Sequence, residues 1–301
     1  SRDYESGTLI ATLKGQSGTT HELRMPTGGT LVNLDVETGE TLDAGARVAV
    51  VPKSLVSQYL TTLRRYATGD FGVTISSDGQ RTVSENLALG LPVSLELGFY
   101  ALLFSLIFGV GAGLYAGLKQ NSWGDHAVMS LSMVGISVPT IVSGPVLILL
   151  CCYGVNGFTK STWGWELFAY GEWSTWRHKL LPVLTLGLVY TAIFARLTRG
   201  GMLEVIRSDY IRTARAKGLD ERRVVLRHAL KGAILPTVTF LGPAMARLVT
   251  GSIVVERIFG IPGLAEYFVT PAINRDYPMV LGVVVLYSTL LVLMVSHVSI
   301  R

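Results

Sequence analysis

The sequence predicts an all-α protein that crosses a membrane several times and carries a small β-rich module at its N-terminus. Three observations support this fold class. Of the 301 residues, 49% are hydrophobic and only 16% are charged, and the mean hydropathy of +0.44 is too apolar for an ordinary soluble domain. Five segments are long enough to cross a bilayer. Basic residues are concentrated in one loop between two of these segments.

Residues 1–53 are predicted to form the small β-rich module. Short alternating runs at 7–13 and 25–51 are broken by glycines, as in strands joined by turns. The second run resembles one half of a barrel-sandwich hybrid, the fold of biotinyl and lipoyl domains. The Met-Lys-Met hairpin of such domains is absent around Lys53, so we expect a structural or docking module rather than a cofactor carrier. A generic β insertion is an equal alternative.

Residues 54–92 are predicted to be an extracytoplasmic connection, and residues 93–301 the membrane domain. The five predicted spans are Val93–Leu118, His126–Tyr153, Leu180–Leu197, Ala233–Val255 and Met279–Ile300. The second span is interrupted at Ser137-Val-Pro139. Gly109, Gly113 and Gly117 recur every four residues along the first span, which predicts a helix face that permits close packing.

The basic loop sets the predicted orientation in the membrane. Residues 196–231 hold ten of the 26 Lys and Arg residues and four Asp or Glu residues. Short basic loops between membrane helices are retained in the cytoplasm. The connection 119–125 and the C-terminus are then also cytoplasmic, and the connections 155–179 and 256–278 are external, as is everything before residue 92. The first of these external connections carries the tryptophans of an interfacial aromatic belt: Trp163, Trp165, Trp173 and Trp176.

The basic loop, for which we predict the bounds 198–231, is itself predicted to contain two helices. Residues 209–217 are rich in helix formers, and Gly218 is a favourable residue just beyond a helix end. Asp220 can cap a second helix that starts at Glu221. An ordered helix–Gly–helix in a cytoplasmic loop predicts contact with a cytoplasmic partner. The alternative is a solvated, positively charged loop with no partner.

Several classes of site are excluded by the residue patterns. The chain has no Gly-x4-Gly-Lys-Ser/Thr motif, so we do not expect it to hydrolyse ATP. Its five histidines are scattered and predict no metal site, and we expect no cofactor. Cys151 and Cys152 are adjacent in an apolar run, which favours buried free thiols over a disulfide. The basic loop has no accompanying aromatic surface, which argues against nucleic-acid binding.

One charge lies in the middle of a predicted span. A charged side chain at the centre of a membrane costs free energy unless it faces a cavity or a partner. Arg247 therefore either lines a translocation pathway or pairs with another helix. Ser252 and Pro139 are the other candidate pathway residues. Glu96 and Glu256 lie near the external ends of spans, and we expect no special role for them.

Several motifs together resemble the permeases of ATP-binding-cassette (ABC) importers. The segment Thr213-Ala-Arg-x-x-Gly218 matches part of their cytoplasmic signature, Glu-Ala-Ala-x3-Gly-x9-Ile-x-Leu-Pro. His228-Ala-Leu-Lys231 replaces its end, as in the peptide/nickel branch. Further matches are Gly69-Asp-Phe-Gly72, Ala116-Gly-Leu-Lys-Gln-Asn121, Val255-Glu-Arg-Ile-Phe-Gly-Ile-Pro-Gly-Leu264 and Asn274-Arg-Asp-Tyr277. The chain resembles the B-type permease subunit of an oligopeptide or dipeptide importer, with a type I importer permease fold.

This resemblance implies a mechanism and a set of partners. A second homologous permease would complete the pathway, two cytoplasmic ATPases would supply the energy, and an extracytoplasmic binding protein would deliver the peptide. The protein would lie in the lipid bilayer of a bacterial inner membrane. The resemblance places the ATPase contact on a coupling helix, with Ala214 and Ala216 permitting close approach; its candidate residues are Asp209, Tyr210, Arg212, Thr213, Ala214, Arg215, Ala216, Lys217 and Gly218.

The resemblance leaves alternatives open. An importer of nickel chelates or another small solute is the nearest one. A secondary transporter would require internal repeats and intramembrane carboxylates, and a membrane receptor or scaffold would not require Arg247. The family has a membrane helix near its N-terminus and a short C-terminal tail that this numbering lacks; we expect that helix in the native protein.

Overall fold

The computed structural model describes residues 55–75 and 81–299, together with residues 2–4, 9–14, 20–24, 29–31, 33–34 and 49–50. For these short N-terminal segments, and for Leu55, Ser57, Gln58, 249–251 and 297–299, only the backbone is described. The chain divides into two units, Ser1–Asp70 and Phe71–Arg301. Each unit is considered by itself.

The first unit contains strands and one helix. Its strands are β1 (Arg2–Tyr4), β2 (Leu9–Lys14), β3 (Thr20–Arg24), β4 (Gly29–Leu31), β5 (Asn33–Leu34) and β6 (Ala49–Val50), and its helix is α1 (Leu55–Ala67). The strands form three separate antiparallel pairs, β1 with β4, β2 with β3 and β5 with β6. The remainder of 1–53, including the segment around Lys53, lies outside the described residues. The predicted resemblance to a barrel-sandwich hybrid depends on those residues and stays a prediction.

The second unit is helical in the part of the chain that is described. Its elements are α2 (Val83–Leu118), α3 (Trp123–Ser137), α4 (Thr140–Leu147), the π-helix η1 (Ile148–Val155), α5 (Asn156–Trp163), α6 (Trp176–Val205), α7 (Asp209–Ala216), α8 (Glu221–Arg223), the π-helix η2 (Val224–Ala229), α9 (Leu230–Ala233), α10 (Leu235–Phe259), α11 (Glu266–Ile273) and α12 (Tyr277–Ser299). Four helical runs are long and apolar enough to cross a membrane, and a pair bent by 48° makes a fifth. The four runs correspond to four of the predicted spans. The bent pair, Glu221–Ala233 with Leu235–Leu248, overlaps the predicted span Ala233–Val255 but begins inside the predicted cytoplasmic loop.

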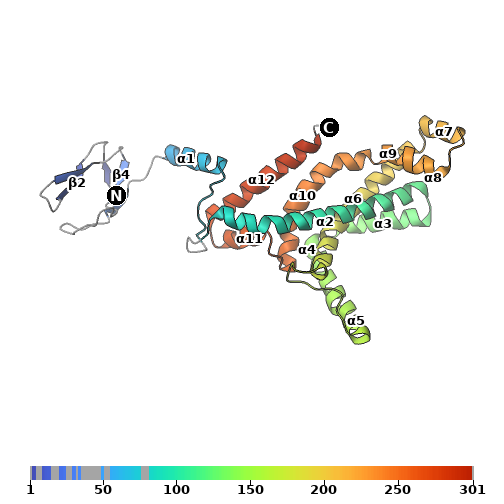
Figure 1. The fold of residues 1–301 in the computed structure, drawn as a ribbon, viewed down its shortest axis with the longest axis horizontal. Coiled ribbons are helices and arrows are strands. Elements are labelled where there is room, and N and C mark those ends of the chain that lie inside the picture. The colour runs from blue at the N-terminus through green and yellow to red at the C-terminus, as the bar shows by residue number, and fades with distance from the viewer. Residues whose placement is uncertain are drawn as a thin grey trace. The chain divides into compact units, whose positions relative to one another are not determined.

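The longest contact in the second unit runs along α2 and α6, which lie side by side (Figure 1). The predicted glycine face of α2 makes this contact. A Cβ on Gly109 would lie 2.7 Å from the Thr191 carbonyl oxygen, and one on Gly117 would lie 2.5 Å from the Met202 Cβ. A Cβ on Gly113 would collide with the carbonyl oxygen of Ala195. The close packing predicted from these glycines is confirmed.

Two predicted span boundaries are wrong. The first span begins at Val83 rather than Val93, because Thr82 and Glu85 form a capping box that starts the helix ahead of Pro92. In the second, α3 ends at Ser137, and the helical run that is long and apolar enough to cross a membrane is Thr140–Trp163. Proline disfavours a helical conformation in the residue before it, and Val138 is extended there. The π-helix then carries the helical run past Tyr153 to Trp163.

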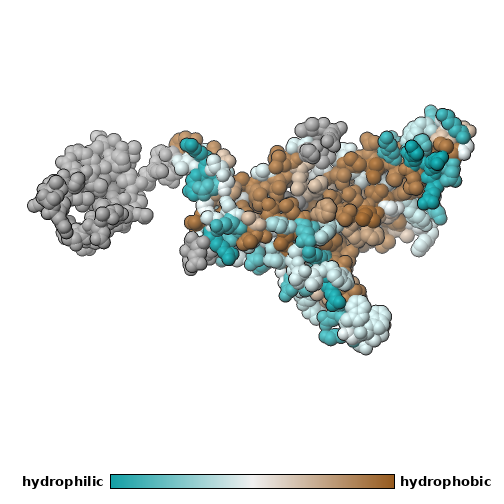
Figure 2. Space-filling model, viewed as in Figure 1, coloured by the Kyte–Doolittle hydropathy of each residue, from teal (hydrophilic) through white to brown (hydrophobic). Residues whose placement is uncertain are grey.

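The core of the second unit has three parts. The central cluster includes Leu97, Leu181, Phe194, Leu248 and Phe259. A second cluster lies between the start of α2 and α12, and a third lies beneath α7. Figure 2 shows hydrophobic residues over the bundle and hydrophilic residues at the end that carries α7 and α8. The polar end of the bundle therefore coincides with the basic loop.

Candidate functional site

The helix α7 begins where the sequence predicts and ends one residue early. Ser208 occupies the N-cap position in an extended conformation, and its Oγ donates a 2.6 Å hydrogen bond to the Val205 carbonyl. The helix ends at Ala216, one residue before the predicted end at Lys217. Gly218 follows with a φ of +73°, the left-handed conformation that glycine adopts without steric cost. The predicted turn at Gly218 is confirmed.

The second helix of the loop is held to the first by an ion pair. Asp220 accepts a hydrogen bond from the backbone N–H of Arg222 at 3.1 Å, which confirms the predicted cap. Across the turn, the Arg215 guanidinium donates to both carboxylate oxygens of Glu221, at 2.7 and 3.1 Å. These contacts fix α7 and α8 as one helix–Gly–helix unit.

One side of α7 is buried against the chain itself. Ile211 and Ala214 pack with Met202, Val224 and Ala229 in the cluster beneath the loop. The resemblance placed Ala214 at the partner contact together with Ala216, but Ala214 is 7% exposed and fills this core. Helical periodicity accounts for the difference, because residues three apart share a face and Ala214 lies below Ile211.

The other side of α7 is open to the surface. Tyr210 is 50% exposed. Its hydroxyl lies close to Gly232, where a Cβ would be only 2.9 Å from it. The remaining exposed candidates are Asp209, Arg212, Thr213, Arg215, Ala216, Lys217 and Gly218. The structure therefore brings eight of the nine candidate residues to one polar surface, with Ala214 as the exception.

An ion pair clamps α3 to α6 near the same end. The Arg199 guanidinium donates to Asp125 at 2.5 and 2.8 Å, and the Asn121 backbone N–H donates to the same carboxylate at 2.9 Å. Asp125 is 1% exposed. The hydrogen bonds from Arg199 outweigh the effect of burial and lower the pKa of Asp125 to about 2. The carboxylate is therefore charged at neutral pH.

The three candidate pathway residues lie in different environments. Arg247 is exposed on α10, between Met245 and Leu248, which line an apolar recess of about 210 Å3 together with residues of α2 and α12. Ser252 is fully buried. Pro139 is exposed and occupies the N-cap position of α4.

Sequence reasoning missed the role of Glu256. The expectation that it needs no special account is wrong, because its side chain is fully buried. Its Oε2 accepts a hydrogen bond from the backbone N–H of Ala265 at 2.9 Å. The neighbouring N–H of Leu264 donates to Ser94 Oγ on α2, also at 2.9 Å. The carboxylate and Ser94 thus hold the 260–265 loop against α2 and α10. Glu256 belongs to the motif 255–264, and its place in that motif is the signal that could have indicated a structural role.

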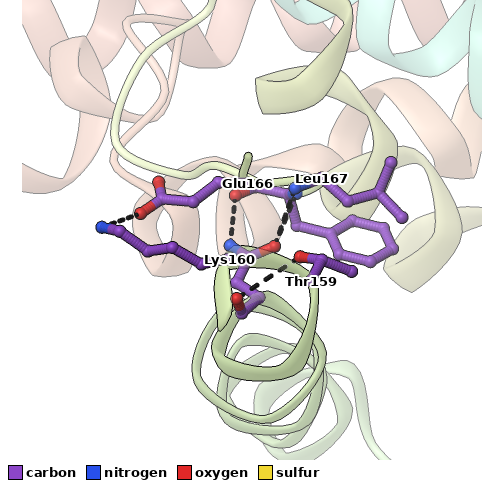
Figure 3. Close-up of polar contacts among 6 residues, drawn as sticks. Thr159, Lys160, Glu166 and Leu167 are labelled. Carbon is purple, nitrogen blue, oxygen red and sulfur yellow. Dashed lines mark hydrogen bonds and ion pairs between the residues drawn. The ribbon is translucent and has the colours of Figure 1, made fainter. Parts of the chain in front are cut away.

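Other polar contacts fix the connection between α5 and α6. The Glu96 carboxylate accepts from Trp173 Nε1 and from Lys179 Nζ, both at 2.6 Å. Asn156 accepts from the Leu167 backbone N–H at 2.9 Å, and Lys160 pairs with Glu166 at 2.8 Å (Figure 3). These contacts return the chain from α5 to the bundle. Cys151 and Cys152 are half-buried free thiols.

Comparisons with known proteins place the chain in a family. Residues 109–300 match the model of the binding-protein-dependent transport system inner membrane component. The oligopeptide transport system permease protein OppB of Salmonella typhimurium is 40% identical over 78% of this chain and 74% of its own length. The dipeptide transport system permease protein DppB of Bacillus subtilis is 40% identical over 81% of this chain and 76% of its own length.

Solved structures support the fold. A chain of the methionine ABC transporter MetNI superposes with a TM-score of 0.55 at 18% identity, covering 71% of this chain and 93% of that one. A chain of an amino acid ABC transporter gives a TM-score of 0.53 at 18% identity, covering 72% of this chain and 92% of that one. The helical second unit and the sequence matches agree: the chain belongs to the family of inner membrane components of binding-protein-dependent transport systems.

Proposed function

We propose that this chain is the permease subunit of an ABC importer that moves peptides into the cytoplasm, and that α7 and Gly218 couple it to ATP hydrolysis. The observation that carries the proposal is the exposed α7–Gly218–α8 unit, fixed by the Arg215–Glu221 pair. A polar, ordered surface at one end of an apolar bundle suits a docking partner outside the membrane. The relatives named as peptide permeases support a peptide substrate.

The proposed assembly contains a second homologous permease, two cytoplasmic ATPase subunits that carry out the hydrolysis, and an extracytoplasmic binding protein. The family description supports a binding protein. The chain lies in a bacterial inner membrane, with α7 and the C-terminus in the cytoplasm. The concentration of basic residues in 196–231 supports this orientation.

The proposed domain organisation follows the same orientation. Residues 1–53 form a small β-rich module outside the cytoplasm, as the alternating runs at 7–13 and 25–51 predict. Residues 54–92 connect it to the permease domain, 93–301. This connection contains α1 and the first turns of α2.

The translocation pathway is proposed to include Arg247, with Ser252 and Pro139 as further candidates. The exposure of Arg247 beside an apolar recess supports a position facing the pathway or the second permease. We expect Arg247→Ala to reduce peptide uptake while leaving the Tm of the purified complex unchanged. A loss of assembly with the ATPases, with no separate transport defect, would assign Arg247 to a structural pair instead.

The coupling proposal is tested at Gly218. A Cβ there meets no atom of this chain within 4 Å, so within the chain a substitution is strained by the backbone conformation and not by crowding at the Cβ. A β-branched residue at a φ of +73° is strained by about 1–3 kcal/mol. In proteoliposomes containing the whole complex, Gly218→Val should uncouple peptide uptake from binding-protein-stimulated ATP hydrolysis.

Gly218→Asn is the matched control, because asparagine tolerates the left-handed conformation. It should retain most of the coupling. If Gly218→Val transports and hydrolyses like the wild type, α7 is not the coupling element. If the asparagine variant fails equally, glycine is required for something other than its backbone conformation.

A further inference from the structure

A groove opens between the last turn of α2 and the helical run that begins at α8. Its volume of about 580 Å3 is within the range of small-molecule sites. One side is apolar and is formed by Leu114 and Leu118 of α2 together with Val225 and Leu226 of η2. Leu118 and Leu226 are 39% and 50% exposed. The groove therefore presents an apolar wall that the described residues do not cover.

The rim of the groove is positively charged. It carries Lys119, Arg215, Glu221 and Arg222. The charges of Arg215 and Glu221 compensate each other in their ion pair. Lys119 and Arg222 are exposed, and among the described residues neither forms an ion pair; Lys119 Nζ lies 5.5 Å from the Tyr115 ring centre. Two cations thus border the apolar wall without a compensating carboxylate.

The position of the groove along α2 gives its depth in a membrane. Lys119 is the C-cap residue of α2, the apolar span Val83–Leu118, so its charge lies where a spanning helix leaves the hydrocarbon. Trp123, which is 86% exposed, and Tyr115, which is 45% exposed, flank it. Exposed Trp and Tyr gather at the bilayer interface. We therefore expect the apolar wall to lie at the depth of the acyl chains and the charged rim at the level of the headgroups.

We propose that this groove binds an anionic phospholipid, with its phosphate between Lys119 and Arg222 and an acyl chain along Leu114, Leu118 and Leu226. Basic pockets between membrane helices bind anionic headgroups by this combination of charges. A zwitterionic lipid offers the same phosphate but brings its own cation, so the rim keeps its net positive charge, and a water-soluble anion leaves the apolar wall exposed. The inference goes beyond peptide import and is independent of the transported substrate.

The test uses the purified complex of permeases and ATPases in detergent, with phosphatidylglycerol that carries a photoreactive group in one acyl chain. We expect cross-links in peptides containing 114–119 and 222–226, with phosphatidylcholine of the same design labelling them weakly. In Lys119→Gln/Arg222→Gln, the apparent affinity should fall about 25-fold, since each basic side chain contributes roughly fivefold.

Two single variants separate the contributions. Arg223→Gln removes the same charge from the same helix α8, but Arg223 does not line the groove, so labelling should match the wild type. Leu226→Gln changes an exposed side chain and keeps both cations, so the complex should assemble while labelling falls. Equal loss in Arg223→Gln would show non-specific attraction and overturn the proposal.

Two further outcomes would also overturn it. Full competition by glycerophosphoglycerol, the headgroup without acyl chains, would show an anion site only. Labelling that occurs only after the ATPases are removed would show that the ATPase covers the groove. Retention of phosphatidylglycerol labelling in the complete complex, with loss in the double variant, supports a lipid site in the assembled transporter.

Discussion

The Glu256 carboxylate and the backbone N–H of Ala265 are joined by a 2.9 Å hydrogen bond inside the protein, although the two residues lie on opposite sides of the end of α10. Gly263 lies against this carboxylate, and a Cβ there would collide with Glu256 Oε2. The loop can follow this path only because residue 263 has no side chain. The motif 255–264 is thus a structural clasp between α10 and the start of α2.

Removing the carboxylate should loosen this clasp. Glu256→Ala leaves the Ala265 N–H without its acceptor in a buried site, which costs about 1–3 kcal/mol. We expect a lower Tm for the purified complex, measured in detergent at neutral pH. Glu266→Ala is the control, since Glu266 is exposed on α11. An unchanged Tm in Glu256→Ala would show that the hydrogen bond is not needed for stability.

The glycine face of α2 predicts a sharp contrast between two substitutions. Gly113→Ala places a methyl group against the Ala195 carbonyl on α6, whereas Gly111→Ala meets no atom within 4 Å. Overpacking of this kind costs about 1–3 kcal/mol. Thermal unfolding of the complex should therefore occur at lower temperature for Gly113→Ala, and Gly111→Ala should match the wild type. Equal behaviour of the two would contradict the packing of α2 on α6.

The Asp125–Arg199 pair predicts a contribution to stability that does not change with pH near neutrality. The folded-state pKa of Asp125 is about 2 and its ordinary value is 3.8. A lowered pKa contributes stability that is fully present above the ordinary value and is lost as the pH falls from there through about 2. Between pH 5 and 8 this pair should therefore contribute a constant amount, and Asp125→Asn should reduce the Tm by a constant amount.

The matched control for this prediction is Glu166→Gln, which breaks the exposed Lys160–Glu166 pair. Exposed ion pairs contribute little, so the Tm should not change. If the Tm difference between wild type and Asp125→Asn varies across pH 5–8, another titrating group governs the clamp.

Orientation is checked by cysteine labelling in intact cells. In a background lacking Cys151 and Cys152, Ser174→Cys should react with a membrane-impermeant maleimide, and Arg227→Cys should react only after the membrane is permeabilised. Both positions are exposed in the structure, so accessibility reports the side of the membrane. The reverse pattern would invert the topology.

Local patterns account for much of the fold. Glycine spacing predicted a closely packed face on α2, although not that α6 is the helix packed there, and Gly218 and Asp220 predicted the two ends of the turn after α7. These features depend on residues that are neighbours along one helix or one turn. The end of the second span could not be read in this way, because the π-helix carries the helical run past Gly154 to Trp163. The start of the first span was also predicted too late, because α2 begins at Val83 and continues through Pro92.

For the candidate site too, the sequence predicted the local features but not the tertiary contacts. The helix–Gly–helix unit follows from its own residues, but the inward direction of Ala214 depends on the cluster beneath it. The burial of Glu256 is a tertiary effect, since its environment is completed by the loop at 263–265 and by Ser94, which is distant along the chain. Single-sequence periodicity contains no information on such contacts.

The contact between Gly201 and Ala233 has a mechanical consequence. A Cβ on Gly201 would collide with the Ala233 carbonyl oxygen, so the backbones of α6 and α9 touch with no side chain between them. At an ordinary helix crossing, side chains can change rotamer and take up a small displacement. Here none is available to do so, and protein interiors are only weakly compressible. If α7 is the coupling element proposed above, we expect a displacement of α9 to move the backbone of α6 directly.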